Sequence, residues 1–428
     1  MKILFFIEPW IELNIPFWKR DYIWWFKDNI LKAFENNIDD TEAMFIINEG
    51  IELDCDTSSM QFYDVIHQHE LLEIFSDSTV ALKAWQNSSF TENELHSMIM
   101  LIKKKLCNFV PDIIFTISPV PYLSQLFPNA KIFHKHGFNL REPFPDEMLS
   151  FDHSGLYGNS IWGQNIQFFK ENNLTKSDTD FIESFKAIFK PIFDTISSEN
   201  YNTIDMIKSK FNHLILFPLQ HNDHNIYRHS TDYLLPSIIE KVFSRLDSSI
   251  GVIVTQHPDS MLLKKDQIAY FKKKYKNFIY LTDTESMHSP SQDLLLLTDG
   301  IISVASHLSF LALILDKPIF SCADSHINKI SDNNSIYQIK ELLERGCSNN
   351  DFKNLLLLFF IKKYNFNYEY FQNHEWLYNR FMSISQSTNI DSYPDIDTSQ
   401  KILDSYIDRI RIPKKMKDIY HDSVTKSE

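Results

Sequence analysis

Two segments in the second half of the chain constrain its fold most, because each is a short β-branched run that ends abruptly in polar residues. Residues 251–258 read Gly-Val-Ile-Val-Thr-Gln-His-Pro, and residues 299–307 read Asp-Gly-Ile-Ile-Ser-Val-Ala-Ser-His. A buried parallel strand reads as a continuous Val/Ile run, and open α/β sheets bind ligands at the carboxyl ends of such strands. We therefore predict two neighbouring strands that bring His-Pro and Ser-x-x-Ser to one edge, where they form an anion site.

Strand-like and helix-like runs alternate along the chain, which predicts parallel sheets with helices on both faces. At 428 residues the chain is too long for one core. We expect an N-terminal Rossmann-like acceptor-side domain at 1–205, a C-terminal Rossmann-like domain at 206–350, and helices at 351–428 that pack back on both. The predicted strands are 3–7, 43–48, 112–118, 131–133, 214–219, 251–255, 278–281, 300–304 and 318–321, and predicted helices of the first half include 21–36 and 92–107.

The composition excludes several classes of protein. Only eight glycines are present, with no GxGxxG and no GxxxxGK[ST], which argues against dinucleotide dehydrogenases and P-loop NTPases. A formal net charge of −14 argues against a nucleic-acid partner, although a local basic cluster can still bind a small anion. The four cysteines are widely spaced with no CxxC, as expected of a reduced cytoplasmic protein without disulfides or a zinc site.

The ends of the chain carry an apolar run at the start and a basic stretch near the finish. The apolar run at 3–7 meets Glu8 and Pro9 directly, which is typical of a first strand and not of a signal peptide. No segment reaches the roughly 20 apolar residues of a membrane span. The basic stretch at 408–417 is expected to be a solvated charged end, with peripheral contact with the inner membrane as the alternative.

Polar residues at the predicted strand ends are candidates for binding a phosphate. His257 is held by Pro258, which fixes the backbone. Ser303 and Ser306, with His307, open an apolar helix, so hydroxyls and free backbone N–H groups would face an anion there. The alternatives are a turn histidine without a ligand and plain helix capping by Ser306.

A further polar segment follows the strand predicted at 214–219. Asp223 lies there among polar neighbours and is a candidate nucleophile or base, with an ordinary loop aspartate as the alternative. His221 and His224 have the i, i+3 spacing of metal ligands, but no third ligand stands at the usual spacing, so we expect no metal.

The first half contributes its own charged segment after the strand predicted at 131–133. Residues 134–136 read His-Lys-His, and Arg141 follows, so Arg141 or Lys135 is a candidate for holding a substrate carboxylate. Asp146 and Glu147 are candidates for an acid or base. A solvated loop with incidental charges remains the alternative.

Taken in order, these segments resemble the capsule-synthesis group of bacterial transferases, which includes the retaining β-Kdo transferases of capsule and O-antigen assembly (Kdo is 3-deoxy-manno-octulosonic acid). The His-Pro and serine segments are also similar to those of bacterial sialyltransferases. The resemblance runs through about residues 130–322. Because each motif is short, its specificity lies in the order and spacing of the motifs. The matching segments are His-Lys-His-Gly-Phe-Asn-Leu-Arg at 134–141, Pro-Leu-Gln-His-Asn-Asp at 218–223, Gln-His-Pro at 256–258, Ser-Val-Ala-Ser at 303–306 and Asp-Lys-Pro-Ile at 316–319.

The resemblance implies an α/β, GT-B-type glycosyltransferase fold, in which two Rossmann-like domains face a cleft and a C-terminal helical tail follows. It implies a CMP-activated sugar acid as the donor, bound mainly by the second domain, and a glycan or lipid-linked saccharide as the acceptor. It also implies a carboxylate nucleophile, with Asp223 first and Asp232 in reserve, and Glu147 as the group that deprotonates the acceptor. No cofactor or metal is required, because CMP leaves with a phosphate of low basicity. The residues expected to contact the donor are Gln220, His257, Pro258, Ser303, Ser306 and His307, with His257 also counted as catalytic.

The expected function is transfer of Kdo from CMP-Kdo to a bacterial surface polysaccharide precursor (capsule, O-antigen or lipopolysaccharide), with retention through two displacements. A CMP-sialic-acid-type sialyltransferase and a non-catalytic glycan-assembly protein on the same scaffold are the alternatives. The chain departs from both enzyme groups at residues 134–137, His-Lys-His-Gly, where capsule enzymes read acidic-x-Gly-Phe and sialyltransferases carry an acidic pair before Gly. Because the acidic pair of sialyltransferases is missing, Kdo is favoured over sialic acid as the transferred sugar. The missing acidic residue of the capsule enzymes is the reason for the non-catalytic alternative.

Overall fold

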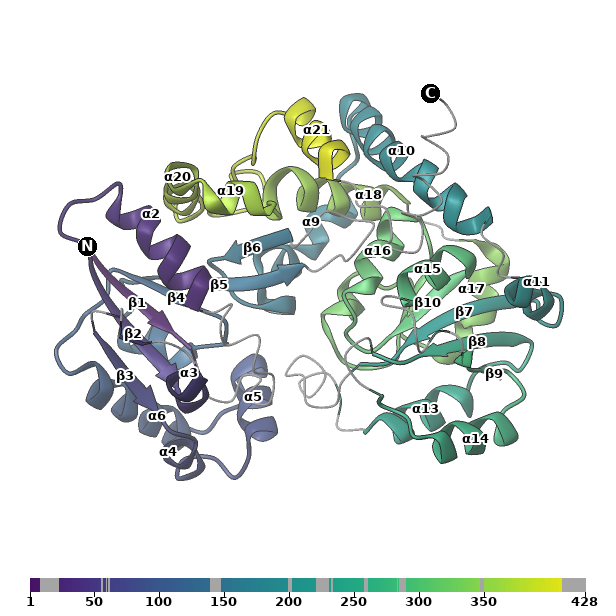
Figure 1. Ribbon diagram of the computed structural model, residues 1–428, viewed down its shortest axis with the longest axis horizontal. Helices are drawn as coiled ribbons and strands as arrows, with labels where there is room; N and C mark the ends of the chain where they lie inside the picture. The colour runs from purple at the N-terminus through teal and green to yellow at the C-terminus, as the bar shows by residue number, and fades with distance from the viewer. Residues whose placement is uncertain are drawn as a thin grey trace.

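The chain folds around two separate β-sheets, which define a first and a second lobe (Figure 1). The first sheet has six strands in the order β3-β2-β1-β4-β5-β6, and the second has five in the order β11-β10-β7-β8-β9. The computed structural model describes residues 1–7, 23–54, 57–58, 60, 62–138, 148–198, 202–220, 231, 234–257, 261–282, 284, 290–346 and 350–409.

The first sheet is parallel from β1 to β5, and β6 closes it in the antiparallel sense. Its register aligns a row of phenylalanines across four strands. The ring of Phe5 stacks on Phe45 at 4.7 Å and on Phe115 at 5.5 Å, and Phe115 stacks on Phe133 at 5.2 Å. All four are fully buried, so this row fixes the register through apolar burial as well as hydrogen bonds. The strands are β1 (Lys2–Phe6), β2 (Glu42–Asn48), β3 (Tyr63–Ile66), β4 (Ile113–Thr116), β5 (Lys131–Phe138) and β6 (Met148–Asp152).

The second sheet is parallel throughout, so the carboxyl ends of its five strands share one edge. Residues of β7, β8 and β10 are almost all buried, as expected of strands covered by helices on both faces. Gly300 is required in β10, because a Cβ there would lie 2.9 Å from the Pro318 carbonyl oxygen. The strands are β7 (His213–Pro218), β8 (Ile250–Thr255), β9 (Phe278–Ile279), β10 (Gly300–Ser303) and β11 (Ile319–Ser321).

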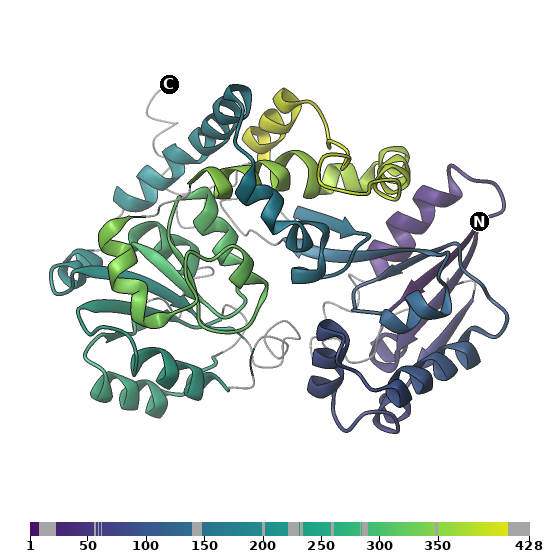
Figure 2. The ribbon, with the colours of Figure 1, turned by 180° about the vertical axis from the view of Figure 1, so that it is seen from behind.

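Helices cover both sheets and join the two lobes (Figures 1 and 2). Those before β7 are η1 (Trp24–Leu31), α2 (Lys32–Glu35), α3 (Glu49–Asp54), α4 (Gln68–Leu72), α5 (Ser78–Asn87), α6 (Glu92–Leu106), α7 (Pro121–Leu126), η2 (Tyr157–Asn159), α8 (Ile161–Gln164), α9 (Ile166–Glu171), α10 (Lys176–Ser198) and α11 (Asn202–Lys208). Those after β7 are α13 (Leu235–Phe243), α14 (Lys265–Lys274), α15 (Pro290–Leu297), α16 (Leu308–Ile314), η4 (His326–Lys329), η5 (Ile336–Gln338), α17 (Ile339–Arg345), α18 (Asn350–Phe359), η6 (Phe360–Tyr364), α19 (Tyr368–Gln372), α20 (His374–Ile384) and α21 (Ser399–Arg409).

The C-terminal helices run from the second lobe back to the first, as Figure 1 shows. Near the second lobe, α18 packs on α9, α10 and α16. At the other end, the ring of Phe381 on α20 lies 4.8 Å from that of Phe115 and 5.1 Å from that of Phe133. Figure 2 shows α21 beside α10, where the ring of Tyr406 lies 4.9 Å from that of Phe185. One buried apolar cluster therefore continues from the first sheet through these helices to the second lobe.

The structure confirms the predicted fold class: an α/β protein with two Rossmann-like sheets and C-terminal helices, the GT-B-type arrangement. The five strands predicted in the second half are all present, as is the helix predicted at 92–107. The helix predicted at 21–36 is described from residue 23 on. The domain boundaries at 205/206 and 350/351 remain predictions.

Three details of the sequence-based prediction are wrong. Strands β3 and β6 were missed, because one is only four residues long and the other pairs antiparallel at the sheet edge. The strand predicted at 131–133 continues to Phe138, so residues 134–138 are strand and not loop, because β6 pairs with them. Strands β8 and β10 are not neighbours, since β7 lies between them.

No helix within the described parts of the chain is long and apolar enough to cross a membrane.

Candidate functional site

The carboxyl edge of the second sheet brings two predicted donor segments into contact. Gln220 follows β7, and its side-chain Oε1 accepts a hydrogen bond of 2.8 Å from the backbone N–H of Ala305, just after β10. The two residues are 85 positions apart in the chain. Because β7 and β10 are adjacent parallel strands, their ends necessarily meet at this edge.

The serine segment after β10 is organised by its own hydroxyls. Ser303 is fully buried, and its Oγ accepts from the N–H of Ser306 at 2.9 Å. The Oγ of Ser306 accepts from the N–H of Leu308 at 3.3 Å, which is the capping role considered above. The N–H groups of Ala305, Ser306 and Leu308 therefore already have protein acceptors. The prediction that N–H groups here are free to bind an anion is therefore wrong for these three.

The loop after β8 is held by Gln256, which places His257 at its start. The Nε2 of Gln256 donates to the carbonyl of Leu263 at 3.1 Å, and its Oε1 accepts from the N–H groups of Leu262 and Leu263 at 2.9 and 3.1 Å. Gln256 is buried and His257 half-buried. Since β7 separates β8 from β10, His257 and Ser303 belong to strands about 10 Å apart. Such a spacing suits a ligand with several polar groups better than a single small anion.

The Asp-Lys-Pro-Ile segment at 316–319 proves to be structural. The Lys317 ammonium donates to the carbonyls of Leu295, at 2.6 Å, of Leu296, at 2.8 Å, and of Thr298, so it caps the C-terminus of α15. Burial lowers the pKa of Lys317 to about 8. Asp316 pairs with Lys186 of α10 at 2.6 Å.

The His-Lys-His segment of the first lobe does not supply three cations. His134 and His136 lie in β5 with only 8% of each residue exposed. Their ring nitrogens contact the backbone oxygens of Asp152, at 3.2 Å, and of Gly155, at 3.0 Å. Burial lowers the pKa of His134 to about 4 and that of His136 to about 3, so both are neutral at pH 7. Lys135 stands over the ring of Trp25 and is the one cation of this segment.

The two lobes meet at a cluster of rings near the end of β5. The ring of Tyr157 lies 5.5 Å from that of His136 in the first lobe and 5.4 Å from that of His326 in the second. His307 lies 6.1 Å from His326, close enough to His136 for their charges to interact. Burial lowers the pKa of His307 to about 4. His307 therefore belongs to the junction between the lobes, next to the serine segment.

Several predicted site residues lie outside the described residues, and their roles stay predictions. They are Arg141, Asp146, Glu147, Asp223, Asp232 and Pro258, together with His221, His224 and the part of the basic stretch from 410 to 417. Among the residues that the structure does describe, no group of three His, Cys, Asp or Glu side chains is placed to hold a metal ion.

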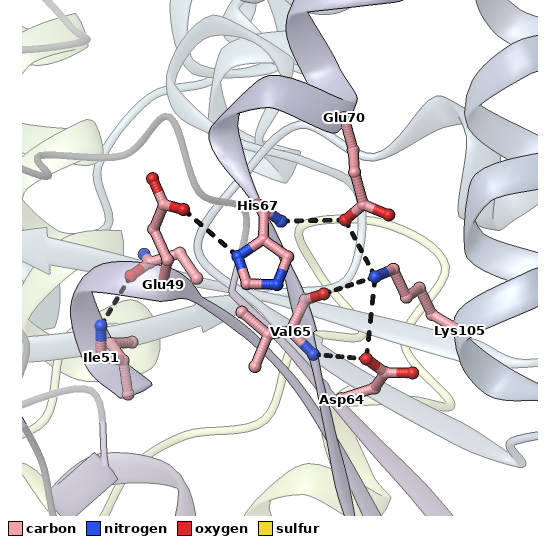
Figure 3. A network of polar contacts seen from close by, with 8 residues as sticks. Glu49, Ile51, Asp64, Val65, His67, Glu70 and Lys105 are labelled. Atoms are coloured by element: carbon pink, nitrogen blue, oxygen red, sulfur yellow. Dashed lines mark hydrogen bonds and ion pairs between the residues drawn. The ribbon is translucent and has the colours of Figure 1, made fainter. Parts of the chain in front are cut away.

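Sequence reasoning missed a polar network at the carboxyl edge of the first sheet (Figure 3). The Nδ1 of His67, just after β3, lies 3.2 Å from the Oε2 of Glu49, just after the neighbouring strand β2. The carboxylate of Glu70 accepts from the backbone N–H of His67 at 3.0 Å, and Lys105 reaches Glu70 at 2.8 Å. The spacing of His67 and Glu70 resembles a helix-capping box, but nothing in the sequence pairs His67 with Glu49.

Comparison with known proteins adds little beyond the fold. No protein-family model and no curated protein sequence matches the chain. Among solved structures, it is similar to the KpsC beta Kdo 2,7 transferase of Thermosulfurimonas dismutans, at 12% identity and a TM-score of 0.36 over 68% of this chain and 89% of that one. For the KpsC beta Kdo 2,4 transferase of the same organism, the identity is 11% and the TM-score 0.37, over 57% of this chain and 78% of that one. For the UDP-GlcNAc 2-epimerase of Methanocaldococcus jannaschii, the identity is 13% and the TM-score 0.31, over 83% of this chain and 98% of that one. At these TM-scores the likenesses carry no argument, and the fold class rests on the sheets and helices themselves.

Proposed function

We propose that the protein is a glycosyltransferase that moves Kdo, or a closely related 2-keto sugar acid, from its CMP donor to a bacterial surface polysaccharide precursor. The donor nucleotide occupies the carboxyl edge of the second sheet, where His257 and the hydroxyl of Ser306 contact its phosphate and ribose, while the buried Ser303 supports Ser306. Arg141 or Lys135 of the first lobe holds the sugar carboxylate, because guanidinium and ammonium groups pair with carboxylates.

The observation that supports this proposal most is the 2.8 Å hydrogen bond between Gln220 and the Ala305 N–H. It joins the Pro-Leu-Gln and Ser-Val-Ala-Ser segments at the edge of a Rossmann-like sheet where ligands of such folds bind. Gln256 and His257 follow β8, the strand on the other side of β7, at the same edge. Three segments that resemble one enzyme group in order along the sequence thus also share one place in the fold.

The proposed reaction retains the anomeric configuration through two displacements. A carboxylate, Asp223 with Asp232 in reserve, attacks the anomeric carbon as the bond to CMP breaks, and the acceptor hydroxyl then displaces that carboxylate. Glu147 is the sequence-based candidate for removing the acceptor proton. CMP leaves as a weakly basic phosphate, so the proposal includes no metal and no cofactor.

Thermal unfolding in the presence of CMP, UDP, GDP or ADP tests the proposal. A ligand at a hundred times its dissociation constant adds about 2.7 kcal/mol of stability, so we expect a CMP-selective rise in Tm that His257→Ala abolishes. His213→Ala is the matched control, since His213 begins β7 at the opposite edge of the same sheet. A rise selective for UDP or GDP would overturn the Kdo assignment. No rise with any nucleotide would favour the non-catalytic alternative, and competition between CMP-Kdo and CMP-sialic acid separates Kdo transfer from sialyl transfer.

A further inference from the structure

The first lobe carries an imidazole–carboxylate pair at the edge of its sheet that the proposed donor site does not include. His67 and Glu49 follow the adjacent parallel strands β3 and β2, so both stand at the carboxyl edge. Their side chains are 38% and 34% exposed, so a substrate can reach them. In Figure 1 the parallel strands β1 and β2 of this lobe run toward the second lobe, and α3, which begins with Glu49, lies on that side.

The contact with Glu49 decides which nitrogen of His67 can act as a base. An ionised carboxylate only accepts hydrogen bonds, so in the neutral imidazole the nitrogen that faces it must carry the proton. The Nδ1 of His67 faces Glu49 Oε2 at 3.2 Å. The proton therefore sits on Nδ1, and Nε2 keeps its lone pair. A base whose second nitrogen is oriented by a carboxylate is the arrangement that general base catalysis uses.

The backbone of His67 is fixed as firmly as its ring. Its N–H donates to the Glu70 carboxylate, which in turn binds the Lys105 ammonium at 2.8 Å (Figure 3). Lys105 also donates to the carbonyl of Val65 at 2.7 Å, with its side chain only 10% exposed. Burial raises the pKa of Glu70, but the hydrogen bonds from Lys105 and His67 outweigh it and leave that pKa lowered, so Glu70 stays charged. Such support holds a reactive side chain in a single position.

We propose that His67 is the catalytic base that deprotonates the acceptor hydroxyl, with Glu49 as its positioning residue. This inference rests on the proposed transferase function and assigns to His67 the role that the sequence gives to Glu147. As the acceptor oxygen forms its bond to the anomeric carbon, the bond from that carbon to the departing oxygen breaks, and its electron pair stays with that oxygen. The acceptor proton passes to Nε2 of His67 and later to water. The acceptor is thus a saccharide hydroxyl presented by the first lobe.

The test measures glycosyl transfer and nucleotide binding on the same variants. For His67→Gln we expect transfer to fall by about 10²- to 10⁴-fold, with the nucleotide-induced rise in Tm unchanged. Imidazole added to His67→Gly is expected to restore part of the rate, which a structural role of the side chain does not allow. His96→Gln is the matched control, because His96 is an exposed imidazole on α6 of the same lobe, and it should keep the full rate.

The role of Glu49 is tested by a double-mutant cycle. Glu49→Gln alone is expected to slow transfer by on the order of tenfold, and to have no further effect once His67 is replaced, because Glu49 acts only through His67. Effects of the two substitutions that simply multiply would overturn the positioning role.

The other outcomes separate this inference from the proposed function. If His67→Gln transfers at the wild-type rate while Glu147→Gln is inactive, Glu147 is the base and the inference is wrong. If His67→Gln and His67→Gly lose both nucleotide binding and transfer, and imidazole restores neither, His67 is structural and the inference is again wrong. If the wild type shows no transfer and no nucleotide-dependent rise in Tm, the proposed function fails and the inference fails with it.

Discussion

The carboxyl edges of the two sheets are built in different ways. In the second lobe, bonds between side chains and nearby backbone fold the loops after β8 and β10, as with Gln256 and Leu263, seven residues apart, or Ser303 and Ser306, three apart. One longer-range bond, from the Ala305 N–H to Gln220 across 85 positions, joins the ends of β10 and β7. In the first lobe, side chains distant in the chain contact one another directly. His67 meets Glu49 across 18 positions, and Asp152 meets Tyr364 across 212.

This difference indicates separate roles for the two edges, ligand binding at the second and stability near β5 at the first. At the second edge, His257 and Ser306 are half-buried, so a nucleotide can reach them. The long-range polar contacts next to β5, in contrast, are buried and join the first lobe to the C-terminal helices. We therefore expect substitutions near β5 to affect mainly stability, and substitutions at the second edge to affect mainly ligand binding.

The largest effect is expected at Asp152, which is fully buried at the end of β6. Its carboxylate accepts from the N–H groups of Ser154 and Ile161 and from the hydroxyl of Tyr364, at 2.7, 2.8 and 2.9 Å. Asp152→Ala leaves these donors buried without an acceptor, so we expect a loss of about 3 to 5 kcal/mol in the free energy of unfolding. Urea denaturation measures it. The control Asp178→Ala, at a half-buried carboxylate in the first turn of α10, should cost about 1 kcal/mol, and an equal loss for both variants would contradict the stabilising role of the buried contacts of Asp152.

Acid should weaken the junction between the lobes through its buried histidines. The pKa of His136 is about 3 in the folded protein, below its ordinary value of 6.5. As the pH falls below 6.5, the unfolded chain binds a proton that the folded chain excludes, so stability is present above that pH and is lost on acidification. Between pH 7 and pH 5 this one group removes about 2 kcal/mol of stability. We expect His136→Gln to reduce the loss between these pH values by that amount in urea titrations, and an unchanged pH dependence would contradict the buried, neutral state.

In the second lobe, Lys317→Met should destabilise the fold without involving the ligand. The variant leaves three carbonyls at the end of α15 without their donor, at a cost of about 1 to 2 kcal/mol. The Tm should fall, while the rise caused by saturating CMP should stay the same. If the substitution instead abolishes that rise, Lys317 belongs to the donor site and not to the scaffold.

A smaller effect, on affinity, is expected from Gln220→Ala. The variant removes the acceptor for the Ala305 N–H and loosens the serine segment. We expect three- to tenfold weaker CMP binding, or about 1 kcal/mol, by isothermal titration calorimetry. The exposed Gln164 on α8 provides the control Gln164→Ala, and equal affinities for the two variants would show that the contact does not shape the site.

No effect is expected from metal removal. The proposed chemistry uses protein side chains alone, so transfer in excess EDTA should equal transfer in Mg²⁺. A loss that Mg²⁺ or Mn²⁺ reverses would show that a metal ion assists the departure of CMP.

How much of this structure can be predicted from the sequence depends on how far apart in the chain the contacting residues lie. Continuous Val/Ile runs such as 251–255 identify buried parallel strands, and the polar residues directly after them can be assigned to one edge. The order of the strands is a different matter, because no local pattern shows that β7 inserts between β8 and β10. In the sequence, His134 and His136 resemble cationic residues of a loop. In the structure they are buried, because β6, more than ten residues later in the chain, pairs with them. The His67–Glu49 pair depends on the adjacency of β2 and β3, which only the fold reveals.

Amide hydrogen exchange, with and without saturating CMP, tests most directly whether the nucleotide binds at the second edge and not at the first. We predict that CMP slows exchange in 255–257, 261–264 and 303–308 at the second edge, and leaves 49–54 and 67–72 at the first edge unchanged. Protection confined to the first-lobe segments, or no protection anywhere, would contradict the assignment of the donor site to the second lobe.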